Sequence, residues 1–400
     1  MSTPSSYPGP GNAWAPRPGY RRSGYPAVSP AQPSSAPAWT PQAMVHRRRG
    51  AVASAIMACL GAIGLAVMLW IIYASTATAA SELLVPILLA LVPLSIVLVT
   101  VRWIDRWEPE PPGVLAAAFL WGAGVATIVS LVINTSASLL VSSTTGSVSG
   151  GEFVSAVVTA PIVEESTKGL GVLIIFLLWR RTFNGAVDGI VYAAVVAAGF
   201  AFAENILYFV QYSDALLVTF LMRGIASPFA HVTFTACTGL AIGASVRMRS
   251  NLAWMWTTPL GLACAIMLHS FWNGILTSDP SLYFFVAIPF FIAAIGLVLW
   301  LRWSERMTMR QRLADYQRAG WFSPAEVTMI TTGAGRAAAR RWAKSRGPAA
   351  ARAMQAFLKA AAALAQLRQQ AIDGHADADF AAQESALLAA IVEQRYAFTR

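Results

Sequence analysis

Eight apolar segments, each long enough to cross a bilayer or nearly so, fill the chain between residues 51 and 301. They lie at residues 51–74, 83–102, 113–141, 153–179, 186–210, 225–246, 253–277 and 281–301. Of the 400 residues, 56% are hydrophobic and only 12% are charged, whereas a soluble domain has about 25% charged residues. This pattern predicts an all-α, polytopic membrane protein with about eight transmembrane helices.

Arginines cluster at alternate ends of these segments and therefore predict their orientation. The clusters on one side are Arg47–Arg49, Arg102 with Arg106, Arg180 with Arg181, Arg247 with Arg249, and Arg302 with Arg306. The opposite loops contain a single arginine, Arg223. Because the arginine-rich side of a membrane protein faces the cytoplasm, we expect a multi-pass plasma-membrane protein with both termini in the cytoplasm.

The two ends of the chain differ from its middle in composition. Residues 1–49 are rich in Pro, Ser and Gly, and we expect a disordered cytoplasmic tail without a cleavable signal peptide. Residues 50–303 form the expected transmembrane domain. Residues 304–400 are rich in Ala and Arg and predict a helical cytoplasmic region, with a helix start at Ser323-Pro324-Ala325-Glu326. The net charge of +10 lies mostly beside apolar segments or in this last region, so it indicates contact with the lipid bilayer and no nucleic acid.

Charged residues interrupt the fourth apolar segment. Glu164, Glu165 and Lys168 all lie within residues 153–179. A charge at the centre of a bilayer costs about 3 kcal/mol or more, so such residues are rare and mark functional sites. Glu164 precedes Lys168 by four residues and shares its helical face, so the two can pair. The segment therefore predicts a polar site inside the membrane.

Three further segments carry polar groups that do not suit lipid. These groups are Glu204 and Asn205 in the fifth segment, His231 in the sixth, and His269 and Asn273 in the seventh. At a rise of ~1.5 Å per residue, Glu164, Glu204, His231 and His269 all lie roughly 9–17 Å from the outer ends of their segments. Each alone is explained equally well by helix–helix hydrogen bonding. Their shared depth favours a single site.

The residue types in this set limit its chemistry. The sequence has no phosphate-binding loop, no GxSxG nucleophile elbow and no HExxH motif. Two histidines and several carboxylates can activate water by two routes. In one, two histidines and a glutamate hold a zinc ion with an open position for water. In the other, a glutamate takes the proton of the water while His and Asn stabilise the oxyanion. Both routes hydrolyse an amide bond.

Taken together, the polar elements resemble the PrsW family of intramembrane proteases, which is related to the CAAX-type and bacteriocin-processing membrane proteases. The matching residues are Glu164-Glu165-x-x-Lys168, Phe200-x-x-x-Glu204-Asn205, His231 and His269-x-x-x-Asn273. The resemblance covers roughly residues 50–300. It implies that the paired glutamates and the two histidines are catalytic, and that the substrate is a membrane protein, in some members an anti-sigma factor.

We therefore expect an intramembrane endopeptidase that cuts a membrane protein near the extracytoplasmic face. The expected catalytic residues are Glu164, Glu165, His231 and His269, with either glutamate as the base. The expected supporting residues are Lys168, Glu204, Asn205 and Asn273, and a zinc ion, if bound, is expected at Glu204, His231 and His269. Two other functions stay open: a proton-coupled transporter and a catalytically inactive membrane scaffold of the same fold. The shared depth of the polar groups and the lack of a visible inverted repeat disfavour the transporter.

The arginine distribution makes a prediction about topology. A cysteine introduced at Ser147 should react with a membrane-impermeant thiol reagent added to intact cells, and a cysteine introduced at Asn184 should react only after the membrane is opened. The reverse labelling pattern would overturn both the orientation and the depth argument.

Overall fold

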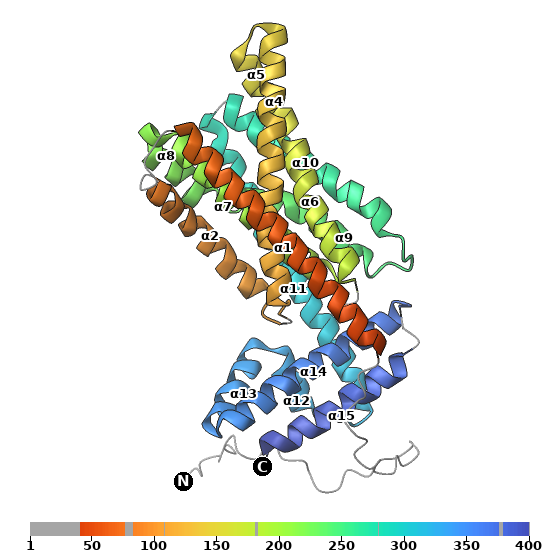
Figure 1. The fold of residues 1–400 in the computed structure, drawn as a ribbon. Coiled ribbons are helices and arrows are strands. Elements are labelled where there is room, and N and C mark those ends of the chain that lie inside the picture. The colour runs from red at the N-terminus through yellow and green to blue at the C-terminus, as the bar shows by residue number, and fades with distance from the viewer. Residues whose placement is uncertain are drawn as a thin grey trace, which may run out of the picture. The chain divides into compact units, whose positions relative to one another are not determined.

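The structure is a computed structural model that describes residues 41–76, 83–107, 109–180, 183–278, 280–375 and 379–399. These residues contain helices and no strands, which confirms the all-α fold. They form two compact units, residues 41–301 and residues 302–399, and Figure 1 shows the helices of each. We call the first the membrane unit and the second the C-terminal unit.

The membrane unit consists of helices that are mostly long enough to cross a bilayer. Its α-helices are α1 (Pro41–Thr76), α2 (Leu84–Ile104), α3 (Pro112–Leu120), α4 (Thr127–Thr145), α5 (Val148–Val154), α6 (Ala160–Leu178), α7 (Ala186–Gln211), α8 (Leu216–Phe220), α9 (Ala230–Ser245), α10 (Trp254–Ser278) and the first part of α11 (Tyr283–Arg318). Three π-helical turns, η2 (Trp121–Ala126), η3 (Ser155–Thr159) and η5 (Leu221–Ala226), and two 3₁₀ turns, η4 (Ser213–Ala215) and η6 (Pro280–Leu282), complete it.

Six helical stretches in the described residues are long and apolar enough to cross a membrane. They are residues Ala51–Ala74, Leu84–Ile104, Pro112–Thr145, Ala186–Gln211, Ser213–Ser245 and Tyr283–Arg318. The other two expected segments form helices α6 and α10, which carry the glutamates, Lys168, His269 and Asn273. The chain is therefore a polytopic helical membrane protein. The expected disordered tail lies outside the described residues up to residue 40, and α1 already begins at Pro41.

Helix α7 is the centre of the membrane unit. It contacts α2, α3, α6 and α9, and every one of its residues from Asp188 to Phe200 is buried. A helix that is apolar on all sides can be buried on all sides, and the run from Ile190 to Ala203 contains no charged residue. Glu204 and Asn205 follow directly, so they emerge from the most deeply buried helix of the unit.

Glycines let α7 and α9 approach until their backbones touch. A Cβ atom placed on Gly189 would lie 2.0 Å from the carbonyl oxygen of Gly239, and one placed on Gly239 would lie 2.2 Å from the carbonyl oxygen of Gly189. Small residues at such crossings allow close helix packing in membranes. This contact fixes α9, and with it His231, against α7.

The C-terminal unit has a hydrophobic core of its own. It comprises the end of α11 together with α12 (Pro324–Thr331), α13 (Gly333–Ser345), α14 (Pro348–Ile372) and α15 (Phe380–Thr399). Buried residues such as Leu313, Phe357 and Ile391 form its core. The expected helix start at Ser323 is confirmed: the backbone N–H of Ser323 donates to Glu326 Oε2 at 2.8 Å, and the N–H of Glu326 donates to Ser323 Oγ at 3.1 Å.

The close crossing of α7 and α9 predicts that a Gly→Ala substitution there lowers the stability of the protein, whereas the same change elsewhere in a helix raises it. A Gly→Ala change inside a helix normally stabilises by about 0.5–1 kcal/mol. Gly296→Ala in α11 should behave in this way, because a Cβ there meets nothing within 4 Å. Gly189→Ala should instead destabilise the protein by about 1–3 kcal/mol, because the helices must separate. Thermal unfolding of the two purified variants in detergent compares them; a Gly189→Ala chain as stable as the Gly296→Ala chain would contradict the crossing.

Candidate active site

The two glutamates stand on α6 directly after a π-helical turn. The turn η3 precedes α6, and Pro161 lies in the first turn of α6. Both features release main-chain hydrogen bonds, and π-turns are frequent at functional sites. Glu164 is 5% exposed, and Glu165 and Lys168 are fully buried. The charges predicted to lie inside the membrane are thus enclosed by protein.

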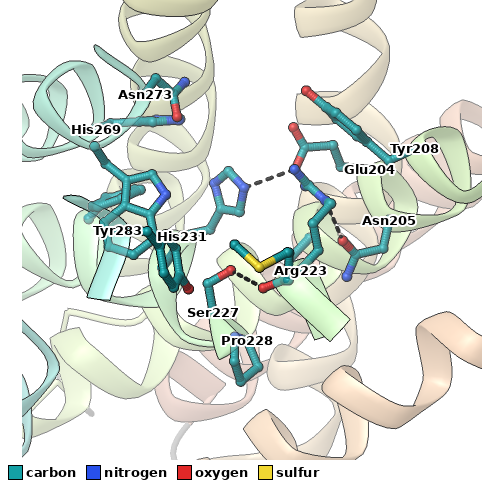
Figure 2. Close-up of a pocket in the computed structure, with 15 residues that line it drawn as sticks. Glu204, Asn205, Tyr208, Arg223, Ser227, Pro228, His231, His269, Asn273 and Tyr283 are labelled. Atoms are coloured by element: carbon teal, nitrogen blue, oxygen red, sulfur yellow. Dashed lines mark hydrogen bonds and ion pairs between the residues drawn. The ribbon is translucent and has the colours of Figure 1, made fainter. Parts of the chain in front are cut away.

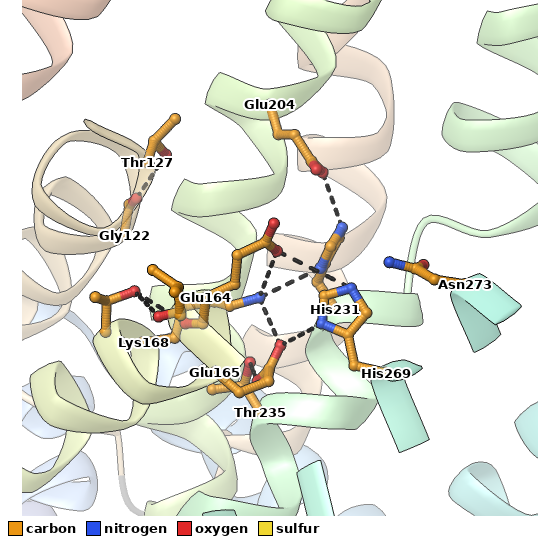
Figure 3. Close-up of polar contacts among 12 residues, drawn as sticks. Gly122, Thr127, Glu164, Glu165, Lys168, Glu204, His231, Thr235, His269 and Asn273 are labelled. Carbon is orange, nitrogen blue, oxygen red and sulfur yellow. Dashed lines mark hydrogen bonds and ion pairs between the residues drawn. The ribbon is translucent and has the colours of Figure 1, made fainter. Parts of the chain in front are cut away.

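Glu165 is saturated by three partners (Figure 3). Lys168 Nζ lies 2.6 Å from Glu165 Oε1, and His269 Nδ1 lies 3.1 Å from the same oxygen. The hydroxyl of Thr235 donates to Glu165 Oε2 at 2.8 Å. Thr235 was not predicted, although it follows His231 by four residues and so shares its helical face. With both oxygens engaged, Glu165 is built to hold Lys168 and His269 in place.

Glu164 has an oxygen to spare. Its Oε1 accepts a long hydrogen bond from Asn134 Nδ2 at 3.4 Å, whereas its Oε2 is buried and has no hydrogen-bond partner in the described part of the chain. This Oε2 lies 3.6 Å from Lys168 Nζ and 4.0 Å from His269 Nε2. A buried acceptor without a donor is costly, so it marks a position where a ligand or water fits.

The two histidines face each other across the site. His231 on α9 and His269 on α10 have ring centroids 5.2 Å apart with the ring planes at 84°. One nitrogen of each ring lies within hydrogen-bonding distance of a carboxylate: His231 Nε2 lies 2.9 Å from Glu204 Oε2, and His269 Nδ1 lies 3.1 Å from Glu165 Oε1. Because an ionised carboxylate only accepts, these nitrogens carry the protons in the neutral rings. His231 Nδ1 and His269 Nε2 then present lone pairs.

Arg223 is a further residue of the site that the sequence did not identify, as are Thr235 and Asn134. It comes from η5, and its guanidinium pairs with Glu204 Oε2 and donates from Nε to Asn205 Oδ1 at 3.0 Å. The guanidinium also lies over the ring of Tyr208, 3.8 Å from the ring centre. One signal could have found it, because it is the only arginine on the arginine-poor side of the expected spans.

The two asparagines make structural hydrogen bonds. Asn205 accepts from Arg223, and the amide of Asn273 donates to the carbonyl oxygen of Ala156 at 2.8 Å. Ala156 belongs to η3, so Asn273 ties α10 to the turn that precedes the glutamates. Seven of the eight residues predicted from the sequence are thus linked by hydrogen bonds and ion pairs, directly or through Arg223, into one polar cluster, and the eighth, Asn273, lies one turn after His269 on α10.

An open pocket borders this cluster (Figure 2). Glu204, Arg223, His231, His269 and Asn273 all line it, from α7, η5, α9 and α10. Neither Glu164 nor Glu165 is among its lining residues. His231 and His269 therefore lie between the pocket and the two glutamates of α6. A molecule bound in the pocket would contact these histidines before it reached Glu164.

The donor atoms suit a metal ion, with one change from the expected set. Glu164, His231 and His269 each offer a ligand atom, and these atoms lie within 4.8 Å of one another. The expected set had Glu204 in place of Glu164, but Glu204 holds the outer nitrogen of His231 and pairs with Arg223. Carboxylates behind both histidines and the unpartnered oxygen of Glu164 fit a zinc site. The Lys168 ammonium, whose Nζ lies 3.3 Å from His231 Nδ1, would repel a metal ion at this site, because both are positively charged.

The part of the chain that contains this cluster is similar to a known protein family. Residues 110–297 match the sequence model of the family described as PrsW family intramembrane metalloprotease. Over these residues the membrane unit is similar to the PrsW family. The matched residues include every member of the polar cluster from Glu164 to Asn273. No solved structure matches the chain.

Relatives with the name Protease PrsW are similar to part of this chain. The one from Clostridioides difficile (strain 630) is 35% identical over 156 residues, which are 39% of this chain and 63% of that protein. The one from Bacillus subtilis (strain 168) is 29% identical over 145 residues, 36% of this chain and 64% of that protein. A third, from Shouchella clausii (strain KSM-K16), is 28% identical over 148 residues, 37% of this chain and 66% of that protein. The chain thus spans less than two thirds of the length of each of these relatives.

Proposed function

We propose that this chain is an intramembrane endopeptidase that hydrolyses a peptide bond of a membrane protein. The observation that carries the proposal is the buried Glu164 carboxylate, whose Oε2 lacks a hydrogen-bond partner among the described residues and faces His269 at 4.0 Å. A carboxylate oxygen that accepts no hydrogen bond is free to accept a proton from water. The family match and the relatives named as proteases support peptide hydrolysis over transport.

In the proposed reaction, Glu164 takes a proton from water as the water oxygen attacks the carbonyl carbon of the scissile bond. The same proton then passes to the leaving amide nitrogen as the carbon–nitrogen bond breaks, which yields a carboxylic acid and an amine. Glu165 has both oxygens engaged and orients His269 and Lys168. We therefore propose Glu164, of the two glutamates, as the base.

The oxyanion that forms on the carbonyl requires a donor or a cation. With both rings neutral, His231 Nδ1 and His269 Nε2 are acceptors, so one ring must gain a proton to donate. Three carboxylates, Glu164, Glu165 and Glu204, face two cations, Lys168 and Arg223, which leaves the cluster one negative charge that an additional proton would neutralise. A zinc ion at Glu164, His231 and His269 would instead supply a Lewis acid for the carbonyl oxygen.

The substrate is proposed to be cut near its extracytoplasmic membrane boundary. The site lies about 10 Å from the outer end of the spans at the rise of an α-helix. A transmembrane helix must unwind there, because its amide groups are otherwise hydrogen-bonded and shielded. A single-span signalling protein of the plasma membrane, such as an anti-sigma factor, has the required geometry: the cut releases its outer portion and leaves a stub.

Replacing Glu164 by glutamine should lower cleavage by about 10²–10⁴-fold, because the amide is close in shape but cannot accept a proton. Glu165→Gln should also impair cleavage, through the loss of the His269 contact. Glu152→Gln, on the exposed face of α5, is the matched control and should cleave normally.

Membrane proteomes of cells that carry the wild-type or the Glu164→Gln chain identify the substrate, and mass spectrometry of its new termini maps the cut. Full cleavage by the Glu164→Gln chain would rule out the proposed base. New termini on the cytoplasmic side of the substrate span would be incompatible with the position of the site.

Metal content separates the two chemical routes. If zinc serves the site, the purified chain contains about one zinc per chain, and Glu164→Ala, His231→Ala and His269→Ala each lose it. Glu204→Gln should retain metal at reduced affinity, by about 10–100-fold, because it acts only behind His231. A zinc-free chain that cleaves at the wild-type rate would assign the reaction to the glutamate and the histidines alone.

A further inference from the structure

Helix α4 carries a row of polar residues that the proposed reaction does not use. They follow one another at intervals of three or four positions, so they share one face of the helix. The row begins at the first residue of α4 and ends at its last. Its members, which we call the polar row, are Thr127, Ser130, Asn134, Ser138, Ser142 and Thr145.

The polar row faces protein, whereas the other side of α4 faces outward. Ile133 and Leu139, which are sequence neighbours of row members, are 41% and 65% exposed. Within the row, exposure rises along the helix: Ser130 is buried, Ser138 is half-buried and Thr145 is exposed. The row therefore runs from the arginine-poor end of α4 into the membrane unit, on the side that is turned away from lipid.

Small and polar residues also line the segment that packs against the row. A Cβ atom placed on Gly151 of α5 would lie 2.2 Å from Ser142 Oγ and 2.5 Å from the carbonyl oxygen of Ser138. Four residues later, the hydroxyl of Ser155 donates to the carbonyl oxygen of Asn134 at 3.1 Å. The polar row thus lies between α4 and the segment formed by α5 and η3.

The row meets Glu164 at atoms that have no protein partner. The amide of Asn134 donates to Glu164 Oε1 at 3.4 Å, which leaves Asn134 Oδ1 as an acceptor. Asn134 Oδ1, Ser130 Oγ and Glu164 Oε2 are all buried and have no hydrogen-bond partner in the described part of the chain. Buried polar atoms are nearly always paired, and where no protein group is in reach the partner is ordered water. Three such atoms beside one another indicate a binding site for water.

Beyond Ser130 the row is closed. The hydroxyl of Thr127 donates to the carbonyl oxygen of Gly122 at 3.0 Å (Figure 3). The turn η2 precedes Thr127, and its one polar side-chain atom, the ring nitrogen of Trp121, donates to the carbonyl oxygen of Thr167 at 3.0 Å. The row therefore leads to Glu164 from the Thr145 end of α4 and does not continue to the arginine-rich side.

We propose that the polar row binds a file of water molecules and delivers water from the arginine-poor side of the membrane to Glu164. Each member of the row offers both a donor and an acceptor, as a file of water molecules requires. The delivery of water to the reaction rests on the proposed function, whereas the binding of water to the row does not.

Delivery along α4 suits a reaction that consumes water inside a bilayer. Hydrolysis of each peptide bond uses a water molecule, and the hydrocarbon core of a membrane supplies none. The pocket beside the histidines is lined by residues of α7, η5, α9, α10 and the start of α11, and by no member of the polar row. A substrate that fills this pocket therefore leaves the route along α4 to Glu164 open.

Silver ion tests for water along α4. Ag⁺ is close to water in size, does not cross lipid and binds thiolates, which form in water and not in hydrocarbon. In the full chain, reconstituted in lipid and in chloride-free buffer, Ag⁺ should protect the cysteines of Ser138→Cys and Ser142→Cys from later alkylation. The cysteines of Ile133→Cys and Leu139→Cys, at similar depth on the outward face, should be protected at least about 10-fold more slowly. Mass spectrometry of the peptides separates these sites from the three native cysteines.

A matched pair of variants connects the row to catalysis. Ser138→Thr and Ser138→Val have nearly the same volume, but only threonine keeps the hydroxyl. Ser138→Thr should cleave at the wild-type rate, whereas Ser138→Val should lower kcat about 10-fold with little change in KM, because the row does not line the substrate pocket. Thr135→Val, exposed on the other side of α4, is the control and should cleave normally. A role of Ser138 in packing alone predicts the same rate for both variants at this position.

The proposal is overturned if the introduced cysteines of the row are protected no faster than those at Ile133 and Leu139. It is also overturned if Ser138→Val cleaves as fast as Ser138→Thr, since the row then has no part in supplying water. Failure of the proposed function gives a different result: Ag⁺ protects the row as described, while neither the wild-type chain nor any variant cleaves a membrane protein.

Discussion

The ammonium of Lys168 is the interaction on which the rest of the membrane unit depends. It is fully buried, 2.6 Å from Glu165, 3.6 Å from Glu164 and 4.2 Å from the centre of the Phe200 ring. A cation enclosed in this way has to be surrounded by anions and ring faces, and removing one partner of a buried pair leaves an uncompensated charge. Helices α6, α7 and α9 each contribute a group to that shell, and α10 reaches it through the contact of His269 with Glu165, so the buried charge and the helix packing depend on one another.

Close packing of the helices holds the side chains around Lys168 in fixed positions. α7 is buried along half its length and touches the backbone of α9 at Gly189 and Gly239, which leaves the helices little freedom to slide. Glu204 and His231 project from these two helices and meet at 2.9 Å. The histidine orientations follow from the carboxylates behind them, a common arrangement for metal-binding and catalytic histidines.

Much of this architecture could be predicted from the sequence, because helices in a bilayer obey strong constraints. Apolar length identified the helices, and the shared depth of Glu164, His231 and His269 grouped residues that are up to 105 positions apart. The capping residues at Ser323 identified the start of α12. The sequence did not predict that Glu164, and not Glu204, offers the third ligand atom of the possible metal site. Depth along a helix does not determine on which face of the helix a side chain lies. Arg223 and Asn134 were missed because each contact joins separate helices whose rotation depends on packing.

Three π-helical turns border the polar cluster, and their common feature is one residue more per turn than an α-helix. η2 places Trp121 so that its ring nitrogen donates to the carbonyl oxygen of Thr167 at 3.0 Å, η3 leads into the glutamates, and η5 carries Arg223. Deleting a single residue from such a turn restores α-helix and rotates everything beyond it by about 100°. Evolution can therefore exchange side chains in these turns far more readily than it can change their length. Among descendants of this chain, gaps and insertions should avoid the three turns even where the amino acids within them have diverged.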